Sequence, residues 1–589
     1  MRESGTRGRG RAYNGGMCGI VGFVKENSLK DLYHGLKTLE YRGYDSAGAA
    51  YFDGNKIVIY KRRGRVERLR SFLYAHEANV CMGHTRWATH GAPSKVNAHP
   101  HRAGKWAVVH NGIVENYADL RKELERMGRK MTSATDTEVI AHLLDAYAKE
   151  EGDAERAIRK TVARLKGNWA VAALWEDAPD RVYLFKKGNP LILGEGEGFG
   201  CFASDTPALV RHTRRIYKMK DGEIAVVTKE GCRLLCEEGA IGPAFGETTL
   251  LPDEVDKGAY PTYMEKEIAE IPDAMEKTAA YIEGATPKGL WEGVDRVILT
   301  GCGTAYHACL YGASLCEGVA AEAVVASEFA ERAEVVDGHT LVVAVSQSGE
   351  TADTLTAVRL AKERGAKVVG VTNVPSSGLT GAVDECLVTR AGAEIAVAAT
   401  KSYATQLVAL RGLLGEDAAA DVACAVRAVR ETAGRQGALA AVAKRKFDNV
   451  FLLSKGRDHA TCLEGALKIK EVAYMPCDTC YAGEIKHGPL ATVTAKTLVV
   501  ALATESRYAE KMRSAIAEVR ARGAKVLVVS SDEALLRAGD WGFALPAVAR
   551  AAAPMVAVVP LMYLALRLAL ERGLDPDKPR NLAKSVTVE

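Results

Sequence analysis

An internal repeat in the second half of this 589-residue chain constrains its fold more than any other feature. Residues 295–303 and 448–456 both begin with a polar residue, continue as an apolar run and end at a glycine turn, 153 positions apart. Further on, 340–344 returns as 497–501 and 364–368 returns as 522–526, at offsets of 157 and 158. Because self-similarity at a nearly constant offset marks repeated structural units, the sequence predicts two tandem copies of one domain.

The apolar runs of each copy, such as 341–345 and 368–371, are short, continuous and separated by amphipathic stretches of helix length. This pattern is typical of a buried parallel sheet covered by helices, in which ligands bind beyond the carboxyl ends of the strands. The first 240 residues differ, because β-rich segments alternate with helical ones and indicate a mixed α+β unit. We therefore predict a multidomain α/β chain.

Residues 239–263 are rich in glycine, proline and acidic side chains without clear periodicity, which is typical of a linker. The predicted organisation is an extension at 1–16, a first domain at 17–242, a linker at 243–262, the two repeats at 263–430 and 431–574, and a tail at 575–589.

Composition excludes several classes of protein. Basic and acidic residues nearly balance, 78 against 74, so neither a nucleic acid nor a membrane surface is an expected partner. The thirteen cysteines are irregularly spaced and odd in number, which predicts free thiols and a reducing, cytoplasmic location. The longest uncharged run, 551–566, is too short to span a membrane and contains two prolines, so we expect a buried core helix.

Cys18 directly follows Met17 and precedes a short apolar strand. Were translation to begin at Met17, removal of that methionine would leave Cys18 with a free α-amine. Such an amine, with a pKa of about 8, can take the thiol proton and return one to a leaving nitrogen. A lone cysteine is more often a buried structural residue, so the neighbouring motifs must decide between the two interpretations.

Polar side chains gather in the segments that follow. Arg86 suits a bidentate grip on an α-carboxylate, and Asp136 suits an α-ammonium. The Asn111 side chain and the Gly112 N–H form a candidate oxyanion hole. Each residue alone is equally consistent with a cap, a turn or a surface ion pair, but together they indicate an amino-acid site.

In the first repeat, the run Ser-Gln-Ser-Gly-Glu-Thr at 346–351 follows an apolar strand and opens a predicted helix. Backbone N–H groups and the helix dipole attract a phosphate at such a position. An ordinary N-cap would need only one hydroxyl, so the three hydroxyls here favour a bound ligand.

These motifs carry a resemblance to a known family. Residues 17–22, 41–46, 83–91, 110–112 and 135–138 resemble the class II glutamine amidotransferases, whose nucleophile is N-terminal. Residues 346–351, 484–489 and 581–589 resemble the glutamine–fructose-6-phosphate aminotransferase (isomerizing) family, the glucosamine-6-phosphate synthases. The likeness covers residues 17–589 and implies an N-terminal Ntn-hydrolase (αββα) domain followed by two sugar isomerase (SIS) domains.

For the first domain, the resemblance implies Cys18 as nucleophile and Asn111 with Gly112 as oxyanion hole. It further implies that glutamine is held by Arg86, Thr89, His90 and Asp136, and that Trp87 gates the path of ammonia. The chain departs from the family in its first sixteen residues, which would replace the α-amine of Cys18 by an amide. We expect them to be absent from the mature protein.

For the repeats, the resemblance implies that the phosphate and hydroxyls of fructose 6-phosphate are bound by Thr304, Ser346, Gln347, Ser348 and Thr351. Ala305 and Ala399 stand where relatives commonly have serine. Glu464, Lys468 and Glu471 share one face of a predicted helix at 463–473, a pattern also typical of surface pairing. The family assigns C1/C2 proton transfer to Glu471, places Lys468 beside it, and gives ring opening to His487 and a Schiff base to Lys584.

The tail at 575–589 would by composition fray, whereas the resemblance implies that it covers the sugar site. His487 would come from a neighbouring subunit, which implies a homodimer. The implied reaction converts L-glutamine and D-fructose 6-phosphate to D-glucosamine 6-phosphate and L-glutamate without a cofactor, with ammonia released at Cys18 and passed internally to the sugar site. No Walker sequence occurs, 301–303 lacks the third glycine of a dinucleotide loop, and no metal-binding motif is present.

Two alternatives stay open. One is a sugar-phosphate-binding regulator, which would be expected to lack Cys18, Glu471 or Lys584. The other is an amidotransferase with a different acceptor, which would need a different second half.

Overall fold

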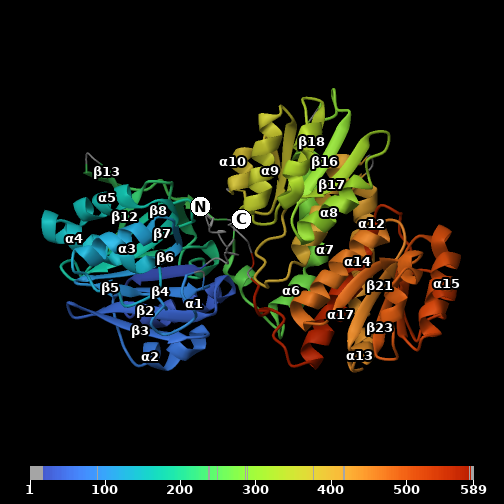
Figure 1. Cartoon of the computed structure of the whole chain (residues 1–589), viewed down its shortest axis with the longest axis horizontal. Coiled ribbons are helices and arrows are strands. Elements are labelled where there is room, and N and C mark those ends of the chain that lie inside the picture. The colour runs from blue at the N-terminus through green and yellow to red at the C-terminus, as the bar shows by residue number, and fades with distance from the viewer. Residues whose placement is uncertain are drawn as a thin grey trace, which may run out of the picture. The chain divides into compact units, whose positions relative to one another are not determined.

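The computed structural model describes residues 18–589 except 89, 237–238, 249, 286, 288, 376, 416–417, 583 and 585–589. The chain divides at Asp256–Lys257 into two compact units, coloured blue to green and green to red (Figure 1). This division lies within the predicted linker. The thirteen cysteines are all free.

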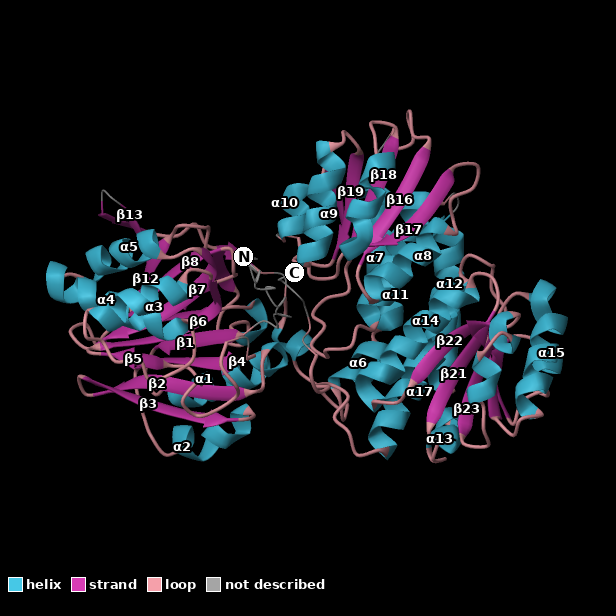
Figure 2. Ribbon diagram, viewed as in Figure 1, coloured by secondary structure: helices cyan, strands magenta, loops and turns pink. Residues whose placement is uncertain are grey.

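The first unit contains two antiparallel sheets (Figure 2). In the described residues, the eight-stranded sheet has the order β15-β11-β9-β10-β1-β4-β2-β3 and the seven-stranded sheet the order β14-β13-β12-β8-β7-β6-β5. The former comprises β1 (Gly19–Val24), β2 (Ser46–Asp53), β3 (Lys56–Arg63), β4 (Val80–Arg86), β9 (Ile192–Gly196), β10 (Phe199–Ala203), β11 (Arg215–Lys218) and β15 (Gly246–Glu247). The latter comprises β5 (His101–Ala103), β6 (Trp106–Val114), β7 (Gly167–Trp175), β8 (Val182–Lys187), β12 (Ile224–Thr228), β13 (Gly231–Cys236) and β14 (Gly239–Ile241).

Strict alternation along β6 fixes the layers of this unit. Ala107 and Val109 point into the core between the two sheets, whereas Trp106 and Val108 pack against helices on the other face. Those helices are α3 (Tyr117–Arg126), α4 (Thr137–Glu151) and α5 (Ala154–Arg164), while α1 (Leu29–Thr38) and α2 (Arg70–Tyr74) belong to the eight-stranded side. The unit is therefore a helix–sheet–sheet–helix sandwich, which confirms the predicted αββα class.

The second unit contains two five-stranded parallel sheets with the same strand order, β17-β16-β18-β19-β20 and β22-β21-β23-β24-β25. The first has β16 (Arg296–Gly301), β17 (Ala320–Val325), β18 (Thr340–Val345), β19 (Lys367–Thr372) and β20 (Glu385–Val388). The second has β21 (Asn449–Ser454), β22 (Cys477–Tyr481), β23 (Thr497–Ala503), β24 (Lys525–Ser530) and β25 (Trp541–Ala544). The tandem α/β domains predicted from the repeat are confirmed.

Helices surround both parallel sheets. With the first sheet are α7 (Ile271–Ala285), α8 (Thr304–Ala313), α9 (Ala352–Glu363), α10 (Gly378–Ala382) and α11 (Lys401–Leu414). With the second are α13 (Ala438–Ala443), α14 (Asp458–Lys468), α15 (Ala509–Arg520), α16 (Glu533–Leu536) and α17 (Ala553–Glu571). Helices α6 (Tyr263–Ala269) and α12 (Ala418–Gly434) contact both α7 and α17. One apolar cluster runs from Leu299 and Val343 of the first sheet to Leu452 and Val500 of the second. The two domains thus share a core, which keeps residues from both in fixed positions.

Helix α17 is, among the described residues, the one helix long and apolar enough to cross a membrane. However, 89% of its apolar window is buried inside the protein. Its side chains join the cluster shared by the two parallel domains. It is therefore the core helix expected from 551–566, extended by a few residues at its carboxyl end.

Candidate active sites of the two units

Cys18 lies at the start of β1, which pairs antiparallel with β4, so the thiol comes to lie beside the residue that follows β4. The Trp87 N–H donates to the sulfur at 3.3 Å, and the thiol approaches the Trp87 carbonyl at 3.5 Å. In the described part of the chain these are the hydrogen bonds of the sulfur. Burial raises the pKa of the Cys18 thiol to about 11. The sulfur therefore keeps its proton at neutral pH unless a base removes it.

Two buried groups of opposite charge lie close to this thiol. Arg86 and Asp136 are 3% and 4% exposed, and they shift the pKa of Cys18 in opposite directions. The Arg86 Nη2 donates to the carbonyls of His90 and Gly91, while its Nη1 is buried without a hydrogen bond in the part of the chain that the structure describes. One oxygen of Asp136 accepts from the Val114 N–H at 2.9 Å. A cation with an unused donor and a carboxylate are complementary to the two charged ends of an amino acid.

Asn111 and Gly112 are neighbours in β6. Within the described residues, both polar atoms of the Asn111 side chain are buried without a hydrogen bond, although the side chain lies near the His84 imidazole. Gly112 has φ of +114°, and a Cβ there would lie 2.1 Å from the Asn168 carbonyl oxygen. Position 112 therefore requires glycine. The Asn111 side chain, in turn, has an amide donor available for a ligand.

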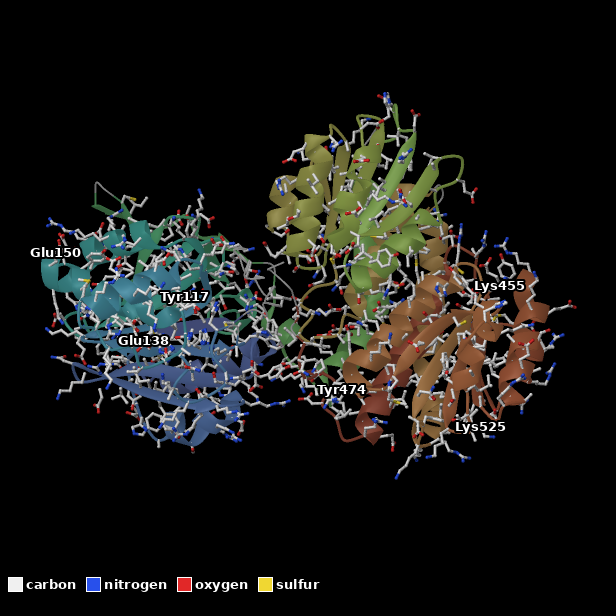
Figure 3. The ribbon with its side chains drawn as sticks, viewed as in Figure 1. Tyr117, Glu138, Glu150, Lys455, Tyr474 and Lys525 are labelled. Atoms are coloured by element: carbon white, nitrogen blue, oxygen red, sulfur yellow. The ribbon has the colours of Figure 1, made fainter. Side chains whose placement is uncertain are left out.

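The remaining predicted residues of this site are less fully defined. Trp87 packs edge-on against Tyr44 at 5.6 Å, and His90 packs edge-on against Tyr117, which Figure 3 labels. Thr89 lies outside the described residues.

The sequence analysis assigned no role to two further residues near this site, Arg42 and Asp205. The Arg42 Nε donates to the Cys18 carbonyl at 3.0 Å, and its Nη1 pairs with Asp205 at 3.1 Å. Arg42 falls within the 41–46 motif, which could have drawn attention to it, whereas Asp205 gave no sequence signal.

Four buried histidines, His84, His99, His101 and His110, extend behind the site. The rings of His84 and His99 stack at 4.1 Å, and His99 and His110 both contact the Thr137 hydroxyl. Burial lowers the pKa of every one of them. The four imidazoles are therefore neutral at pH 7.

In the second unit, the loop 346–351 joins the carboxyl end of β18 to the start of α9. Its hydroxyls are positioned by its own backbone: the Gly349 N–H donates to Ser346 Oγ at 3.1 Å, and the Ser346 and Thr351 hydroxyls lie 2.9 Å apart. Gly349 has φ of +67° and packs against Ser377. Gln347 contributes its carbonyl, which accepts from the Asn373 N–H at 3.0 Å. The loop is therefore a preformed turn with hydroxyls at a helix N-terminus.

Thr304 lies in a different cluster from this loop. Its hydroxyl donates to Glu464 at 3.1 Å and accepts from the Lys468 amine at 3.2 Å. Lys468 also pairs with Glu464 at 3.2 Å and with Glu471 at 2.7 Å. Glu464 and Lys468 are fully buried, and His307 pairs with Glu464 at 2.8 Å. The N-terminus of α8 is therefore joined to an acid–base cluster on the other parallel domain.

The sequence pattern predicts one continuous α-helix at 463–473, but the structure departs from this. It begins at Asp458, and residues Ile469–Ala473 form a π turn (η6). Even so, Lys468 contacts both predicted partners. Burial raises the pKa of Glu471, which keeps this carboxyl ready to hold a proton.

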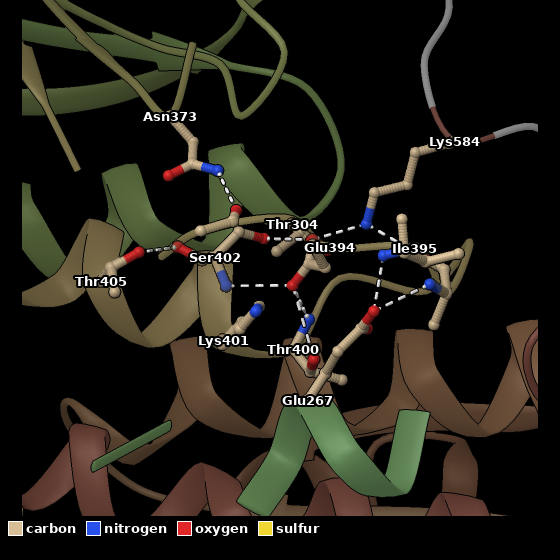
Figure 4. A network of polar contacts seen from close by, with 12 residues as sticks. Glu267, Thr304, Asn373, Glu394, Ile395, Thr400, Lys401, Ser402, Thr405 and Lys584 are labelled. Carbon is tan, nitrogen blue, oxygen red and sulfur yellow. Dashed lines mark hydrogen bonds and ion pairs between the residues drawn. The ribbon is translucent and has the colours of Figure 1, made fainter. Parts of the chain in front are cut away.

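Lys584 lies against Glu394 in a network of buried polar groups (Figure 4). Its amine donates to Glu394 at 2.5 Å and to the Ala396 carbonyl at 2.8 Å. The same carboxylate accepts from Thr400 and from Ser402. Burial opposes ionisation, but Lys584 and these donors hold the pKa of Glu394 at about 2. The Lys584 charge also acts on Glu471, so the two lie near one another.

Two further residues connect this network to its surroundings. Asn373 accepts from the Ala391 N–H and donates to the Gly392 carbonyl, which ties the 346–351 loop to the strand end before Glu394. Glu267 accepts from Ile395 and Ala396, and burial together with Glu394 raises its pKa to about 8. Neither residue gave a distinguishing sequence signal.

The beginning of the tail is anchored. Asp577 is 3% exposed and accepts from the Tyr263 and Met264 N–H groups at the start of α6. His487, in contrast, is exposed on the turn after Glu484–Lys486, and within the described residues its side chain makes no hydrogen bond to the Lys468 or Lys584 clusters. A single chain thus assembles Thr304, Lys468, Glu471 and Lys584, but not His487.

Comparison with known proteins agrees with this division of the chain. The model of the glutamine amidotransferase domain matches residues 85–211. The model of the SIS domain matches twice, at 292–414 and 441–572. A solved structure of the C-terminal domain of glucosamine-fructose-6-phosphate aminotransferase from Francisella tularensis is 31% identical, covers 55% of this chain and all of that chain, and superposes with a TM-score of 0.52.

Curated relatives match over nearly the full length. The glutamine–fructose-6-phosphate aminotransferase (isomerizing) of Symbiobacterium thermophilum is 44% identical over 97% of this chain and all of the relative. The enzyme of the same name from Pyrococcus horikoshii is 42% identical with the same coverage. The chain therefore belongs to the family of glutamine–fructose-6-phosphate aminotransferases (isomerizing).

Proposed function

We propose that this chain transfers the amide nitrogen of L-glutamine to D-fructose 6-phosphate, giving D-glucosamine 6-phosphate and L-glutamate. The observation that carries the proposal is the Cys18 thiol, on which the buried charges of Arg86 and Asp136 both act. In the described residues the same unit also holds the buried Asn111 amide without a hydrogen bond. Family membership supplies the second substrate, because the relatives are named for fructose 6-phosphate.

In the first unit, Cys18 attacks the side-chain carbonyl of glutamine and forms a carbon–sulfur bond. Asn111 and the Gly112 N–H stabilise the oxyanion. The carbon–nitrogen bond then breaks, and ammonia leaves with the proton taken from the thiol. Water hydrolyses the thioester to glutamate. Arg86, Thr89, His90 and Asp136 hold the amino acid during these steps, and Trp87 gates the ammonia path.

The base in this scheme is the α-amine of Cys18. A thiol whose pKa is about 11 needs a base, and in the described residues its hydrogen bonds go to the Trp87 backbone. We therefore propose that active protein begins at Cys18. A chain that retains residues 1–17 would lose this base and turn over glutamine about 10²–10⁴-fold more slowly. Finding those residues by intact mass in fully active enzyme would contradict the assignment.

In the second unit, Ser346, Gln347, Ser348 and Thr351 bind the phosphate and neighbouring hydroxyls, together with Thr304. His487 of a second subunit opens the sugar ring, which makes the enzyme a homodimer. Lys584 leaves Glu394, and its neutral amine adds to the C2 carbonyl and expels water, which gives a Schiff base. Ammonia then adds at C2 and the lysine amine leaves, which gives the C2 imine. Glu471, held by Lys468, moves a proton from C1 to C2 while the C1 hydroxyl proton passes to the nitrogen, so that C2 carries the amine and C1 becomes the aldehyde.

The free thiols and the near balance of charge suit a cytoplasmic enzyme.

The test of the proposed reaction compares Cys18→Ala with Cys236→Ala, which removes a half-buried thiol on β13. Cys18→Ala should abolish glutamate release and glucosamine 6-phosphate formation but retain fructose 6-phosphate isomerisation. Cys236→Ala should retain all three. Glutamine-dependent synthesis by Cys18→Ala would refute the proposal.

A further inference from the structure

The loop after β23 in the second parallel domain occupies the place that the 346–351 loop has in the first. β18 and β23 are the middle strands of sheets with the same order, and both contain Thr-Leu-Val-Val-Ala, 157 residues apart. At this offset the residue equivalent to Ser348 is Glu505. A hydroxyl assigned to phosphate binding in one domain is thus replaced by a carboxylate in the other.

The Glu505 carboxylate is held as a bound anion would be. Its side chain is 5% exposed. One oxygen accepts from the Arg457 N–H at the start of α14 at 3.0 Å, and the other accepts from the Arg550 Nε at 2.6 Å and pairs with Arg507 at 2.8 Å. A Cβ added to Gly456 would lie 2.3 Å from this carboxylate, so the group rests directly on the glycine turn.

Positive charge around the carboxylate exceeds what one carboxylate neutralises. Beside Arg457, Arg507 and Arg550, the Lys455 amine lies over the Tyr508 ring at 5.3 Å (Lys455 is labelled in Figure 3). The Arg457 Nη2 donates to the Ser314 carbonyl at 2.6 Å, and within the described residues its Nε is buried without a hydrogen bond. Of the other carboxyls nearby, Asp458 accepts from the N–H and hydroxyl of Thr504, and Glu317 acts on the charge of Arg457. Although burial opposes ionisation, the Arg457 N–H and Arg550 hold the pKa of Glu505 below its usual value.

The groups needed for proton transfer are missing from this second location. At the offset of 153 between the repeats, the positions equivalent to Lys468 and Glu471, the pair proposed above for proton transfer, are Leu315 and Gly318, and the position equivalent to Glu464 is Tyr311. The Tyr311 hydroxyl is occupied by the Ala551 carbonyl at 2.9 Å. The second domain therefore has an arrangement for binding an anion but no acid–base pair to act on a sugar.

We propose that the Glu505 carboxylate takes the place of a phosphate group in the second domain and so restricts sugar-phosphate binding to the first. Removal of this carboxylate leaves the Arg507 and Arg550 side chains, and the Arg457 N–H at the start of α14, without this partner. The vacated position then accepts a phosphate monoester or inorganic phosphate. The comparison with Ser348 rests on the phosphate role proposed above for the 346–351 loop.

Reciprocal substitutions test this inference in the full chain. Titration calorimetry with D-glucitol 6-phosphate, which lacks a carbonyl, should give one site per chain in the unchanged protein and two in Glu505→Ser. Ser348→Glu should remove the first site, and the double variant should bind once. Glu505→Ser binding no more ligand than the unchanged protein would overturn the inference.

A second measurement remains decisive if Glu505→Ser is less stable. Replacing chloride by inorganic phosphate at equal ionic strength should raise the Tm of Glu505→Ser more than that of the unchanged protein, because only the variant gains a site. Equal shifts would overturn the inference. Absence of binding by the unchanged protein would instead refute the role of the 346–351 loop, and a site gained by Glu505→Ser would still support the inference.

Discussion

Replacement of Asn111 by leucine should separate the stability of the first unit from its chemistry. Among the residues that the structure describes, neither polar atom of this buried side chain has a hydrogen-bond partner. A buried polar group that lacks a partner costs about 1–3 kcal/mol, and an apolar group of similar shape removes that cost. Asn111→Leu should therefore leave the unit as stable as before or more stable by up to about 3 kcal/mol.

The same substitution should nearly abolish glutamine hydrolysis. If the Asn111 amide donates to the oxyanion, its loss removes about 2.7–4 kcal/mol of transition-state stabilisation, a decrease in kcat of about 10²–10³-fold. Glutamate release measures this step directly. Fructose 6-phosphate isomerisation, which belongs to the other unit, serves as an internal control and should not change.

Asn97 provides a matched control for stability. It is also buried, but its Nδ2 donates to the Ala92 carbonyl at 2.9 Å and its Oδ1 accepts from the Ala134 N–H at 3.0 Å. Asn97→Leu should therefore destabilise the unit by about 1–3 kcal/mol. At about 2–4 °C per kcal/mol for a unit of this size, calorimetry should resolve the two variants. The reasoning is refuted if Asn111→Leu lowers the Tm as much as Asn97→Leu, or if it retains full glutaminase activity.

Three further predictions follow from buried groups. Gly112→Ala should reduce glutaminase kcat at least as strongly as Asn111→Leu, because its Cβ would lie 2.1 Å from the Asn168 oxygen; normal turnover would contradict the need for glycine. Lys468→Met removes the lysine that pairs with the buried Glu464, which keeps its contacts with Thr304 and His307, and should destabilise the second unit by about 3–5 kcal/mol; calorimetry that detects no change would exclude a structural ion pair. Glu267 has its pKa raised to about 8, so its contribution is full below its unfolded pKa of about 4.5 and is lost as pH rises through 8. Glu267→Gln should therefore flatten the pH dependence of the Tm between pH 5 and 8, and an unchanged profile would refute that assignment.

The fold was predictable because its signals are repeated or periodic. The strand that begins at Thr340 and the one that begins at Thr497 share a pentapeptide, and β6 alternates between two cores over its whole length. Such patterns act over many residues and survive local variation. The π turn at Ile469–Ala473 has no comparable signal, since one widened turn leaves the hydrophobic pattern almost unchanged.

The candidate sites were predictable only where a motif is contiguous. Arg86 and Ser346 lie in short runs with unusual composition, so the sequence alone draws attention to them. Glu267 and Asp205 are ordinary acidic residues in ordinary segments, and they reach their partners through chain folding over long separations. The role proposed for His487 requires a second subunit, and no pattern within one chain can position a residue of another chain.

The buried histidines of the first unit imply that glutamine hydrolysis and sugar isomerisation do not fail together in acid. Four histidines stay neutral in the folded unit because burial lowers their pKa: His84, His99, His101 and His110. Below a pH of about 6.5 the same histidines bind protons in the unfolded chain, so acid favours unfolding of this unit. Glu267 in the second unit has the opposite bias and favours folding as the medium acidifies. Mild acid would thus destabilise the first unit and not the second. The protein would lose glutamine-dependent amination and keep the isomerisation of the ketose.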